Sequence, residues 1–297
     1  MTWVKNYIYN CINNINTLFK KNEHYSKAAW EYQKKIIMPH IKDTDVVIDI
    51  GSGNYPVPRA DILVDFFPDE SIHRSGNVIE DKPLVVCSIE RLPFREKSID
   101  FAISSHVFEH VDNPAKAASE LMIIAKAGYI ETPAYGKDVI VGSGYMHKWQ
   151  IVEFEGTLHF FEYSQRQHEA NICSPVMGLW MQKRYHPWQD FFWERQDIFN
   201  AWVLWYDNIK IIEYRRNNKQ WYPLREWEQV PQELMLNQKP MLSQTEIKLL
   251  QSCLATPDHK NMMFYKEDHF EDSTGKYIYP IRGKRIYCEM LKSSNNK

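Results

Sequence analysis

The chain has 297 residues, 44% of them hydrophobic, which is enough for one large domain or two modest domains. Its formal net charge is −2 and its pI is about 6.6, so no sequence-wide basic field attracts nucleic acid, and we expect no DNA partner. The five cysteines include no CxxC pair, which argues against a disulfide framework or a structural zinc site and favours a reducing compartment.

The N-terminal part of the chain, residues 1–44, is expected to form a helical cap. Apolar residues recur at helical spacing within residues 2–20, and a second helix over about Ser26–His40 leads into the first strand. The first helix is expected to pack on the catalytic domain, and contact with a membrane surface or a partner protein is the minor alternative. With no run of 18 apolar residues and no signal-peptide pattern, we expect a cytoplasmic protein.

The stretch Val46–Pro58 contains a short apolar run that ends at Gly51 and Gly53. A second apolar run, Asp61–Asp65, ends in a carboxylate. A buried parallel strand, a glycine turn and a strand ending in an acid form the pattern by which an α/β sheet binds a nucleoside, with the carboxylate on the ribose hydroxyls. The alternatives are a tight turn in an ordinary sheet and a helix N-cap role for Asp65.

The connection between these two strands departs from the usual strand–helix–strand unit. Pro56 and Pro58 disfavour a helix, and only about ten residues separate Gly51 from Asp61. The sequence therefore predicts a loop or a single turn as the first crossover.

Further motifs follow in order along the chain: Val85–Phe94, Ser98–Ser105, Val107–Val111, Asn113-Pro114 and Gly128–Pro133. Together with the glycine turn, this succession over residues 45–133 resembles the class I S-adenosylmethionine-dependent methyltransferases, in particular their type 11 branch. The resemblance implies a Rossmann-like, doubly wound and mostly parallel α/β sheet over residues 45–215, with S-adenosyl-L-methionine as the cofactor.

The resemblance also implies a set of cofactor-binding residues. Asp49 is expected to orient the glycine loop or to meet the amino-acid end of the cofactor, Asp65 to bind the ribose, and Ser88 with Ile89 to lie beside the adenine. The complete predicted set is Asp49, Gly51, Ser52, Gly53, Asp65, Ser88, Ile89 and Ser104. Two departures from the family pattern, Tyr55 for a glycine and Ser88 for an aspartate, raise the alternative of a catalytically inactive binding protein.

Candidate catalytic residues follow the predicted strand Phe101–Ser104. We expect His106 at its carboxyl end and a helix that carries Glu109 and His110, which places His106 and His110 one turn apart. A histidine has a near-neutral pKa that suits deprotonation of a hydroxyl. His106, or His110 with Glu109, is the predicted base, and His147 is the second candidate.

A metal-dependent variant of this site is the alternative. The stretch also resembles small-RNA 2′-O-methyltransferases and ubiquinone-pathway O-methyltransferases, which use a Glu-x-x-Glu-His arrangement for a divalent ion. Here His106 replaces the first glutamate, and His147 or His159 would complete the set. The His-x-x-Glu-His peptidase motif is rejected because it follows a nucleotide-binding strand. No metal is assigned from the sequence.

After a predicted helix Pro114–Lys126 and strand Tyr129–Thr132, residues 135–207 read as an insertion on the acceptor side. Trp149–Tyr163 alternates like a hairpin with Glu155-Gly156 as the turn. Seven of the ten tryptophans lie within residues 180–227, where helical spacing favours a helical core and an aromatic pocket for a sugar face is the functional alternative. Ile209–Tyr214 is predicted as a late strand of the main sheet.

The C-terminal part is predicted as a polar linker over residues 216–244 and a small β-rich domain over residues 245–297. The segments Leu249–Leu254, His259–Asp268 and Tyr277–Ile286 resemble the small methyltransferase-activator family. That resemblance implies a domain that docks on the catalytic sheet and stabilises it. An unrelated β-hairpin tail is the alternative.

Taken together, the sequence predicts methyl transfer to a hydroxyl of a small-molecule or glycan acceptor. An RNA acceptor, suggested by the activator-like tail, is the disfavoured alternative. The sequence leaves the oligomeric state open.

Overall fold

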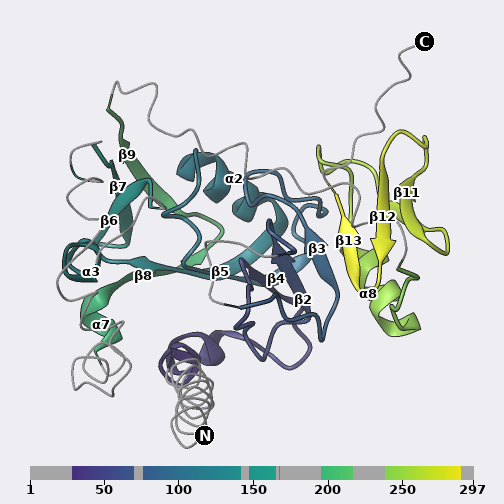
Figure 1. Ribbon diagram of the computed structural model, residues 1–297, viewed down its shortest axis with the longest axis horizontal. Helices are drawn as coiled ribbons and strands as arrows, with labels where there is room; N and C mark the ends of the chain where they lie inside the picture. The colour runs from purple at the N-terminus through teal and green to yellow at the C-terminus, as the bar shows by residue number, and fades with distance from the viewer. Residues whose placement is uncertain are drawn as a thin grey trace, which may run out of the picture.

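The computed structural model describes residues 29–69, 76–141, 147–164, 167, 195–216 and 238–288. Ten of the described strands form one large sheet (Figure 1) with the strand order β10-β11-β12-β13-β3-β2-β1-β4-β5-β8. The predicted helix over residues 2–20 and the tryptophans at 180, 188, 193, 221 and 227 lie outside the described residues. Among the described helices, none has the length and apolar character that a membrane crossing requires.

The central strands are short, buried and apolar, as parallel strands covered on both faces must be. They are β1 (Val47–Ile50), β2 (Ile62–Asp65), β3 (Leu84–Val86), β4 (Ile99–Ser105) and β5 (Ala125–Pro133). All five run parallel in the order β3-β2-β1-β4-β5, and β8 (Asn200–Tyr206) pairs antiparallel with β5. The predicted mixed α/β fold with a mostly parallel, doubly wound sheet is therefore confirmed.

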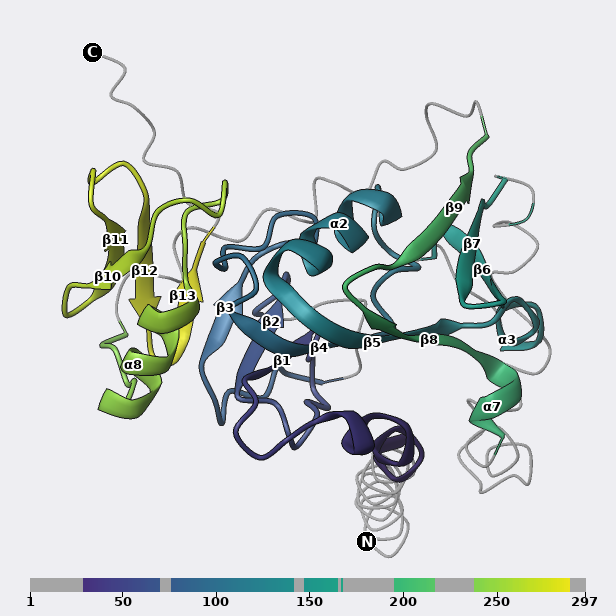
Figure 2. The same cartoon turned by 180° about the vertical axis from the view of Figure 1, so that it is seen from behind.

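Helices cover the two faces of this sheet (Figure 2). On one face, α2 (Pro114–Ile124) begins at the N-cap Asn113, whose side chain accepts from the Lys116 N–H, and it buries Ala117, Leu121 and Ile124. On the opposite face, a helix over residues 29–37 places Ile37 against Phe101 and Tyr129 and continues into η1 (Met38–His40).

The crossover between β1 and β2 is a loop, as predicted. Residues 51–61, all of which the structure describes, form turns and no helix. Gly51 and Ser52 donate their N–H groups to the Val64 carbonyl, so β2 itself anchors the turn. Without a helix here, the glycine loop lies directly on the ends of β1 and β2.

A smaller sheet, β6-β7-β9, lies beyond β8. The predicted hairpin is confirmed as β6 (Trp149–Phe154) and β7 (Thr157–Glu162), with positive φ at both turn residues, Glu155 and Gly156. The prediction for Ile209–Tyr214 is wrong in its location, because β9 (Lys210–Tyr214) pairs with β7. The helix that the apolar spacing predicted over residues 199–206 is also wrong. Residues 200–206 instead form β8, which pairs with the edge of β5.

The C-terminal part adds to the opposite edge of the main sheet. It contains α8 (Gln244–Cys253), β10 (Met263–Tyr265), β11 (His269–Asp272), β12 (Ile278–Arg282) and β13 (Arg285–Tyr287). β13 pairs parallel with β3, so the sheet is continuous across this junction. The Arg285 guanidinium also contacts Glu80 at 2.6 Å and Asp69 at 2.8 Å, which ties β13 to the segments before β3 and after β2.

Candidate functional site

The glycine loop after β1 packs tightly against the turn after β4. Gly51 has φ of 76° and Gly53 has φ of 51°, values in the left-handed region that favours glycine. A Cβ atom on Gly51 would lie 2.2 Å from Cγ2 of Val107. A larger residue at position 51 would therefore push apart the two segments that carry the predicted cofactor and catalytic residues.

Asp65 ends β2 and holds this loop in place. One carboxylate oxygen accepts from the Gly53 N–H at 2.9 Å and the other accepts from the Phe67 N–H at 2.8 Å. The side chain is buried at the carboxyl edge of the sheet, where ligands of open α/β sheets bind. The alternative role as a helix N-cap is not adopted, because residues 66–69 are not helical.

Asp49, in β1, also orients the loop. Its Oδ2 accepts from the Val57 N–H at 2.7 Å, and the residue is only 3% exposed. Burial raises the pKa of Asp49 to about 7, the negative charge of Asp65 adds to the rise, and the Val57 hydrogen bond opposes it. The folded protein therefore favours the protonated form of this carboxyl.

Two buried hydroxyls at the same edge support a ligand there. Ser52 Oγ and Ser104 Oγ have no hydrogen-bond partner among the described residues, and Ser104 lies beside Ile50 in the β1–β4 register. A buried hydroxyl without a partner costs free energy, so each is suited to a polar ligand group. These two orphaned hydroxyls, beside Asp65 and the glycine loop, fit the polar part of a nucleoside cofactor.

The predicted adenine side lies at the end of β3. Ile89 is buried, and Ser88 Oγ accepts from the Glu90 N–H at 3.1 Å. Glu90 in turn accepts from the N–H groups of Asp112 and Asn113, at 2.8 and 3.1 Å. The loop after β3 is thus tied to the segment that leads into α2. All eight predicted cofactor residues lie along or next to the carboxyl edge of the sheet.

The turn after β4 corrects one prediction. Residues 106–111 form a bend and a turn rather than a helix, and His106 has φ of 57°. The His106 N–H donates to the Glu131 carbonyl at 2.8 Å, which draws the chain toward β5 instead of into a helix. His106 Nδ1 then lies 3.4 Å from Glu109 Oε1, and Nε2 lies 3.8 Å from Glu131 Oε1.

Glu109 occupies the centre of the cluster and is 1% exposed. Burial alone would raise the pKa of Glu109, but the hydrogen bond from His106 and the charges of His110, His106 and His147 hold it at about 2. Its second oxygen, Oε2, is buried and has no partner within the described part of the chain. An ionised carboxylate with an orphaned oxygen is ready to accept a further donor or a cation.

His147 joins this cluster through contacts of the residues that follow it. The Lys148 N–H donates to the Glu109 carbonyl, Lys148 Nζ contacts Asp112 at 2.7 Å, and Trp149 Nε1 donates to the Val111 carbonyl. As a result, the His147 and His110 rings meet edge to face with centroids 4.9 Å apart. The predicted residues His106, Glu109, His110 and His147 therefore form one cluster, whereas His159 contacts Tyr214 on the small sheet.

An Asp–His pair orients His147. His147 Nδ1 lies 2.9 Å from Asp138 in α3 (Tyr135–Val141), and the Tyr163 hydroxyl donates to the same carboxylate at 2.9 Å. Burial would lower the pKa of His147, but the hydrogen bond to Asp138 and its charge prevail, and the pKa is raised. Because the carboxylate accepts, the proton of the neutral ring is on Nδ1 and the lone pair is on Nε2.

Three of these residues could also hold a cation. Glu109, His110 and His147 each offer a ligand atom, and these atoms lie within 4.8 Å of one another. Imidazole and carboxylate ligands suit several divalent metals. The orphaned oxygen of Glu109 is compatible with such an ion, so the metal alternative has a defined set of ligands, without the His106 of the sequence prediction.

The sequence reasoning missed four polar residues of the site. Glu131 is 1% exposed and accepts from Gln33 Nε2, Ser105 Oγ and the Tyr129 hydroxyl. An acid within the otherwise apolar run of β5 was an available signal for Glu131. Asp138, Lys137 and Gln33 lie in polar, helical segments, where no local pattern distinguishes them from surface residues.

Comparison with known proteins agrees with this geometry. Residues 63–130, from β2 to β5, match the family model described as a methyltransferase domain. This stretch of the chain is therefore similar to a methyltransferase domain, and the match supports S-adenosylmethionine as the cofactor. A search of curated protein sequences finds no match.

Similar solved structures carry related descriptions. A structure of the Haloferax volcanii Trm112 methyltransferase activator in complex with a methyltransferase matches at 17% identity, covering 42% of this chain and 62% of that chain, with a TM-score of 0.31. S-adenosylmethionine-dependent methyltransferases from Mesorhizobium loti and Aquifex aeolicus match at 12% and 11% identity, with TM-scores of 0.34 and 0.29. The Mesorhizobium loti match covers 60% of this chain and 96% of that chain, and the Aquifex aeolicus match covers 58% of this chain and 87% of that chain. Scores of this size define no substrate or partner here.

Because the pKa of Asp49 is raised, we predict that Asp49→Asn increases stability at high pH but weakens cofactor binding. Because folding favours the protonated form, the stability from this group is present below pH 3.8 and is lost as pH rises toward about 7. Asp49→Asn keeps an acceptor for the Val57 N–H and removes the buried charge. We expect its Tm to exceed that of the wild type by a few degrees at pH 8 and to equal it near pH 4.

The same variant is expected to bind S-adenosylmethionine about tenfold more weakly at pH 8, because a cationic ligand favours the ionised carboxylate. Wild-type affinity should rise between pH 6 and pH 8, while that of Asp49→Asn stays flat. Thermal melts and calorimetric titrations at these pH values test both effects. Equal pH dependence in the two proteins would show that Asp49 does not titrate as described.

Proposed function

We propose that the chain transfers the methyl group of S-adenosylmethionine to a hydroxyl of a sugar or small metabolite in the cytoplasm. The observation that carries this proposal is the cluster of histidines around the buried carboxylate of Glu109, beside the proposed cofactor edge. Transfer to a hydroxyl requires removal of a proton, and the pair of Asp138 and His147 is suited to that task.

The geometry of the edge supports the following cofactor roles. Asp65 would accept from the ribose hydroxyls, Ser52 and Ser104 would hydrogen-bond the amino-acid end, and Ser88 with Ile89 would line the adenine side. When bound, the cofactor supplies an electrophilic methyl group on a sulfonium, which leaves as a neutral thioether once the acceptor oxygen takes the methyl. The chain then has to align the acceptor and take its proton.

The geometry favours His147 over His106 as the base. Both ring nitrogens of His106 face protein carboxylates, those of Glu109 and Glu131. Asp138 instead accepts from His147 Nδ1, which places the lone pair of the neutral ring on Nε2, the nitrogen that would take the hydroxyl proton. His106, Glu109 and His110 would then hold the acceptor and balance charge around the base.

A divalent ion on Glu109, His110 and His147 is the alternative mechanism. In that case these residues would bind the ion and the ion would polarise the acceptor hydroxyl, instead of His147 accepting the proton directly.

A methyl-transfer assay with a labelled methyl group tests the proposal. The acceptor panel should contain neutral glycans, small hydroxylated metabolites and RNA, each with and without excess EDTA. We expect transfer to a neutral hydroxyl compound that EDTA does not reduce. Loss of transfer in EDTA and its return with added Mn²⁺ or Mg²⁺ would favour the metal mechanism. Methylation of RNA alone, with binding that weakens steeply with salt, would contradict the proposed acceptor class.

A further inference from the structure

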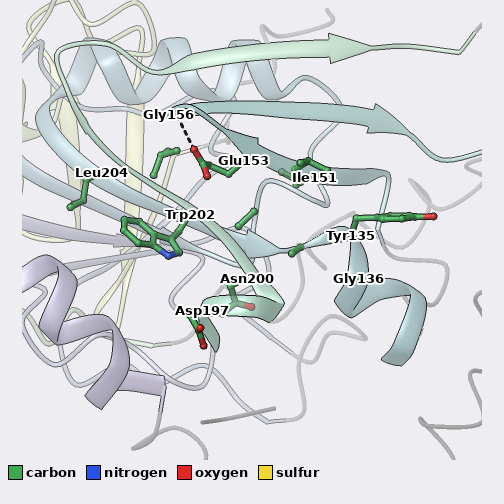
Figure 3. Close-up of a pocket in the computed structure, with 13 residues that line it drawn as sticks. Tyr135, Gly136, Ile151, Glu153, Gly156, Asp197, Asn200, Trp202 and Leu204 are labelled. Carbon is green, nitrogen blue, oxygen red and sulfur yellow. Dashed lines mark hydrogen bonds between the residues drawn. The ribbon is translucent and has the colours of Figure 1, made fainter. Parts of the chain in front are cut away.

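A cavity of about 600 Å³ lies outside the histidine cluster, none of whose residues lines it (Figure 3). It is formed by the first residues of α3, by β6 and by β8. Figure 3 shows Trp202 and Asn200 on the β8 side and Ile151 and Glu153 on the β6 side. This volume falls within the range of small-molecule sites. The cavity also begins at the carboxyl end of β5, next to the edge where the cofactor is proposed to bind.

Helix α3 connects the cavity to the proposed base. Tyr135 and Gly136, at its start, line the cavity. Lys137 Nζ donates to the Asn200 side chain at 2.9 Å, and Asn200 also lines the cavity. Asp138, the next residue, holds His147. Three residues of helix span about 4.5 Å, so the wall of the cavity and the group that orients the base lie within one helical turn.

The edge of β8 contributes backbone hydrogen-bonding groups. The Phe199 carbonyl accepts from the Ala134 N–H, so residue 199 directs its backbone toward the β5 side. Backbone direction alternates along a strand, so Trp202 and Leu204 direct their N–H and C=O groups away from β5, as does Asn200, whose N–H already donates to the Gln196 carbonyl. All three residues line the cavity. A ligand in the cavity can therefore bond with backbone N–H and C=O groups of β8 in addition to the Asn200 side-chain amide.

The wall of the cavity combines aliphatic side chains with aromatic, amide and acidic ones. The Trp202 ring packs against Tyr129 with centroids 5.9 Å apart, which fixes the indole. Glu153 and Asp197 add carboxylates, and the hydrogen bond from Arg195 holds the pKa of Asp197 below its usual value. Among the described lining residues there is no lysine or arginine. Arg195 pairs with Asp197 and Lys137 bonds to Asn200, whereas Glu153 has no ion pair within the described part of the chain, so a phosphate or carboxylate ligand would meet the like charge of Glu153.

We propose that this cavity binds the methyl acceptor as a neutral sugar ring and discriminates against phosphorylated and acidic sugars. The inference rests on the proposed function, since it locates the acceptor of that reaction. The apolar face of the sugar stacks on Trp202, and its hydroxyls donate to Glu153 and Asp197 and bond with Asn200. One hydroxyl is thereby directed along α3 toward His147.

The test measures binding directly, without methyl transfer. Methyl glycosides of glucose, galactose, mannose and N-acetylglucosamine, with glucose 6-phosphate as the anionic probe, are titrated against the full chain by ligand-observed NMR. We expect binding of at least one neutral glycoside, at least tenfold weaker binding of the phosphate, and a loss of at least tenfold in Trp202→Ala. Tyr214→Ala, which removes an exposed aromatic ring of β9 outside the cavity, serves as the matched control and should bind as the wild type does.

A charge-reversal variant at Glu153 tests the proposal even if Trp202→Ala does not fold. Glu153 is exposed, and Glu153→Lys should narrow or invert the preference for neutral over phosphorylated sugar. Equal binding of both probes by the wild type, or unchanged glycoside binding in both variants, overturns the inference. Because S-adenosylmethionine binding is measured separately, sugar binding without cofactor binding would retain the cavity and reject the proposed function. Cofactor binding together with sugar binding that Trp202→Ala leaves unchanged would retain the proposed function and reject the cavity as the acceptor site.

Discussion

His147→Gln is expected to lower the rate of methyl transfer by about 10²–10⁴-fold, the usual contribution of a positioned general base. Asp138 and Tyr163 hold His147 in one orientation, and Lys148 and Trp149 fix it over the turn that carries Glu109. Glutamine keeps a polar side chain of similar reach but cannot accept the proton. Cofactor affinity should remain at the wild-type value, because His147 lies outside the edge formed by β1, β2 and β3.

Asp138→Asn separates positioning from general structural support. An amide can present its NH₂ group to Nδ1 of His147, which moves the proton to Nε2 and removes the lone pair needed there. We therefore expect a large fall in kcat with little change in KM or Tm. A rate of methyl transfer that is unchanged in both variants would contradict the assignment of His147 as the base, and His106 would become the first candidate.

Asp65→Ala is expected to weaken S-adenosylmethionine binding by at least 100-fold. The carboxylate is proposed to hold the ribose, and it also accepts from the Gly53 and Phe67 N–H groups. Its removal leaves these buried donors without their acceptor, at about 1–3 kcal/mol each, and releases the glycine loop. Each 1.4 kcal/mol corresponds to a tenfold change in affinity.

The matched control for this variant is Asp61→Ala, on the segment that leads into the same strand. Asp61 accepts from the Val47 N–H and pairs with Arg59 at the amino end of β2, away from the proposed ligand. It should bind the cofactor as the wild type does, even if it is somewhat less stable. Equal losses in the two variants would indicate general destabilisation of β2 rather than loss of a ribose contact.

The central sheet was predictable because its signals are local. Strands such as Val47–Ile50 are short apolar runs, and Pro56 with Pro58 excludes a helix from the first crossover in any context. Glu155-Gly156 similarly defines the β6–β7 turn. The cofactor residues follow from these elements, since they stand where strands end.

The turn after β4, which carries the candidate catalytic residues, was not predictable in the same way. The spacing of His106 and His110 suits a helix, but the hydrogen bond from His106 to the Glu131 carbonyl depends on β5, far along the chain. Tertiary structure likewise decides which strand pairs with β5. Both β8 and β9 have strand-forming residues, but β8 pairs with β5 and β9 pairs with β7. The pairing of Asp138 with His147 is equally tertiary. Local patterns thus found the histidines and Glu109 but missed Asp138 and Glu131, the other carboxylates that contact these histidines.

The C-terminal strands show a further limit of sequence reasoning. Their resemblance to a small activator family predicted docking on the sheet, and β13 indeed continues the sheet from β3. Whether this part acts as an activator stays a prediction. Its contacts through Arg285 with Asp69 and Glu80 offer a physical route by which it would support the segments flanking the cofactor edge.

Calorimetric titration of the wild-type chain with S-adenosylmethionine and S-adenosylhomocysteine tests the central claim most directly. The structure predicts micromolar binding of one molecule per chain, retained in Asp61→Ala and lost in Asp65→Ala. Absence of binding to the well-folded wild type would contradict the cofactor site. Tyr55 and Ser88 would then mark a methyltransferase fold that has lost its cofactor, and a protein ligand would be sought for the same edge of the sheet.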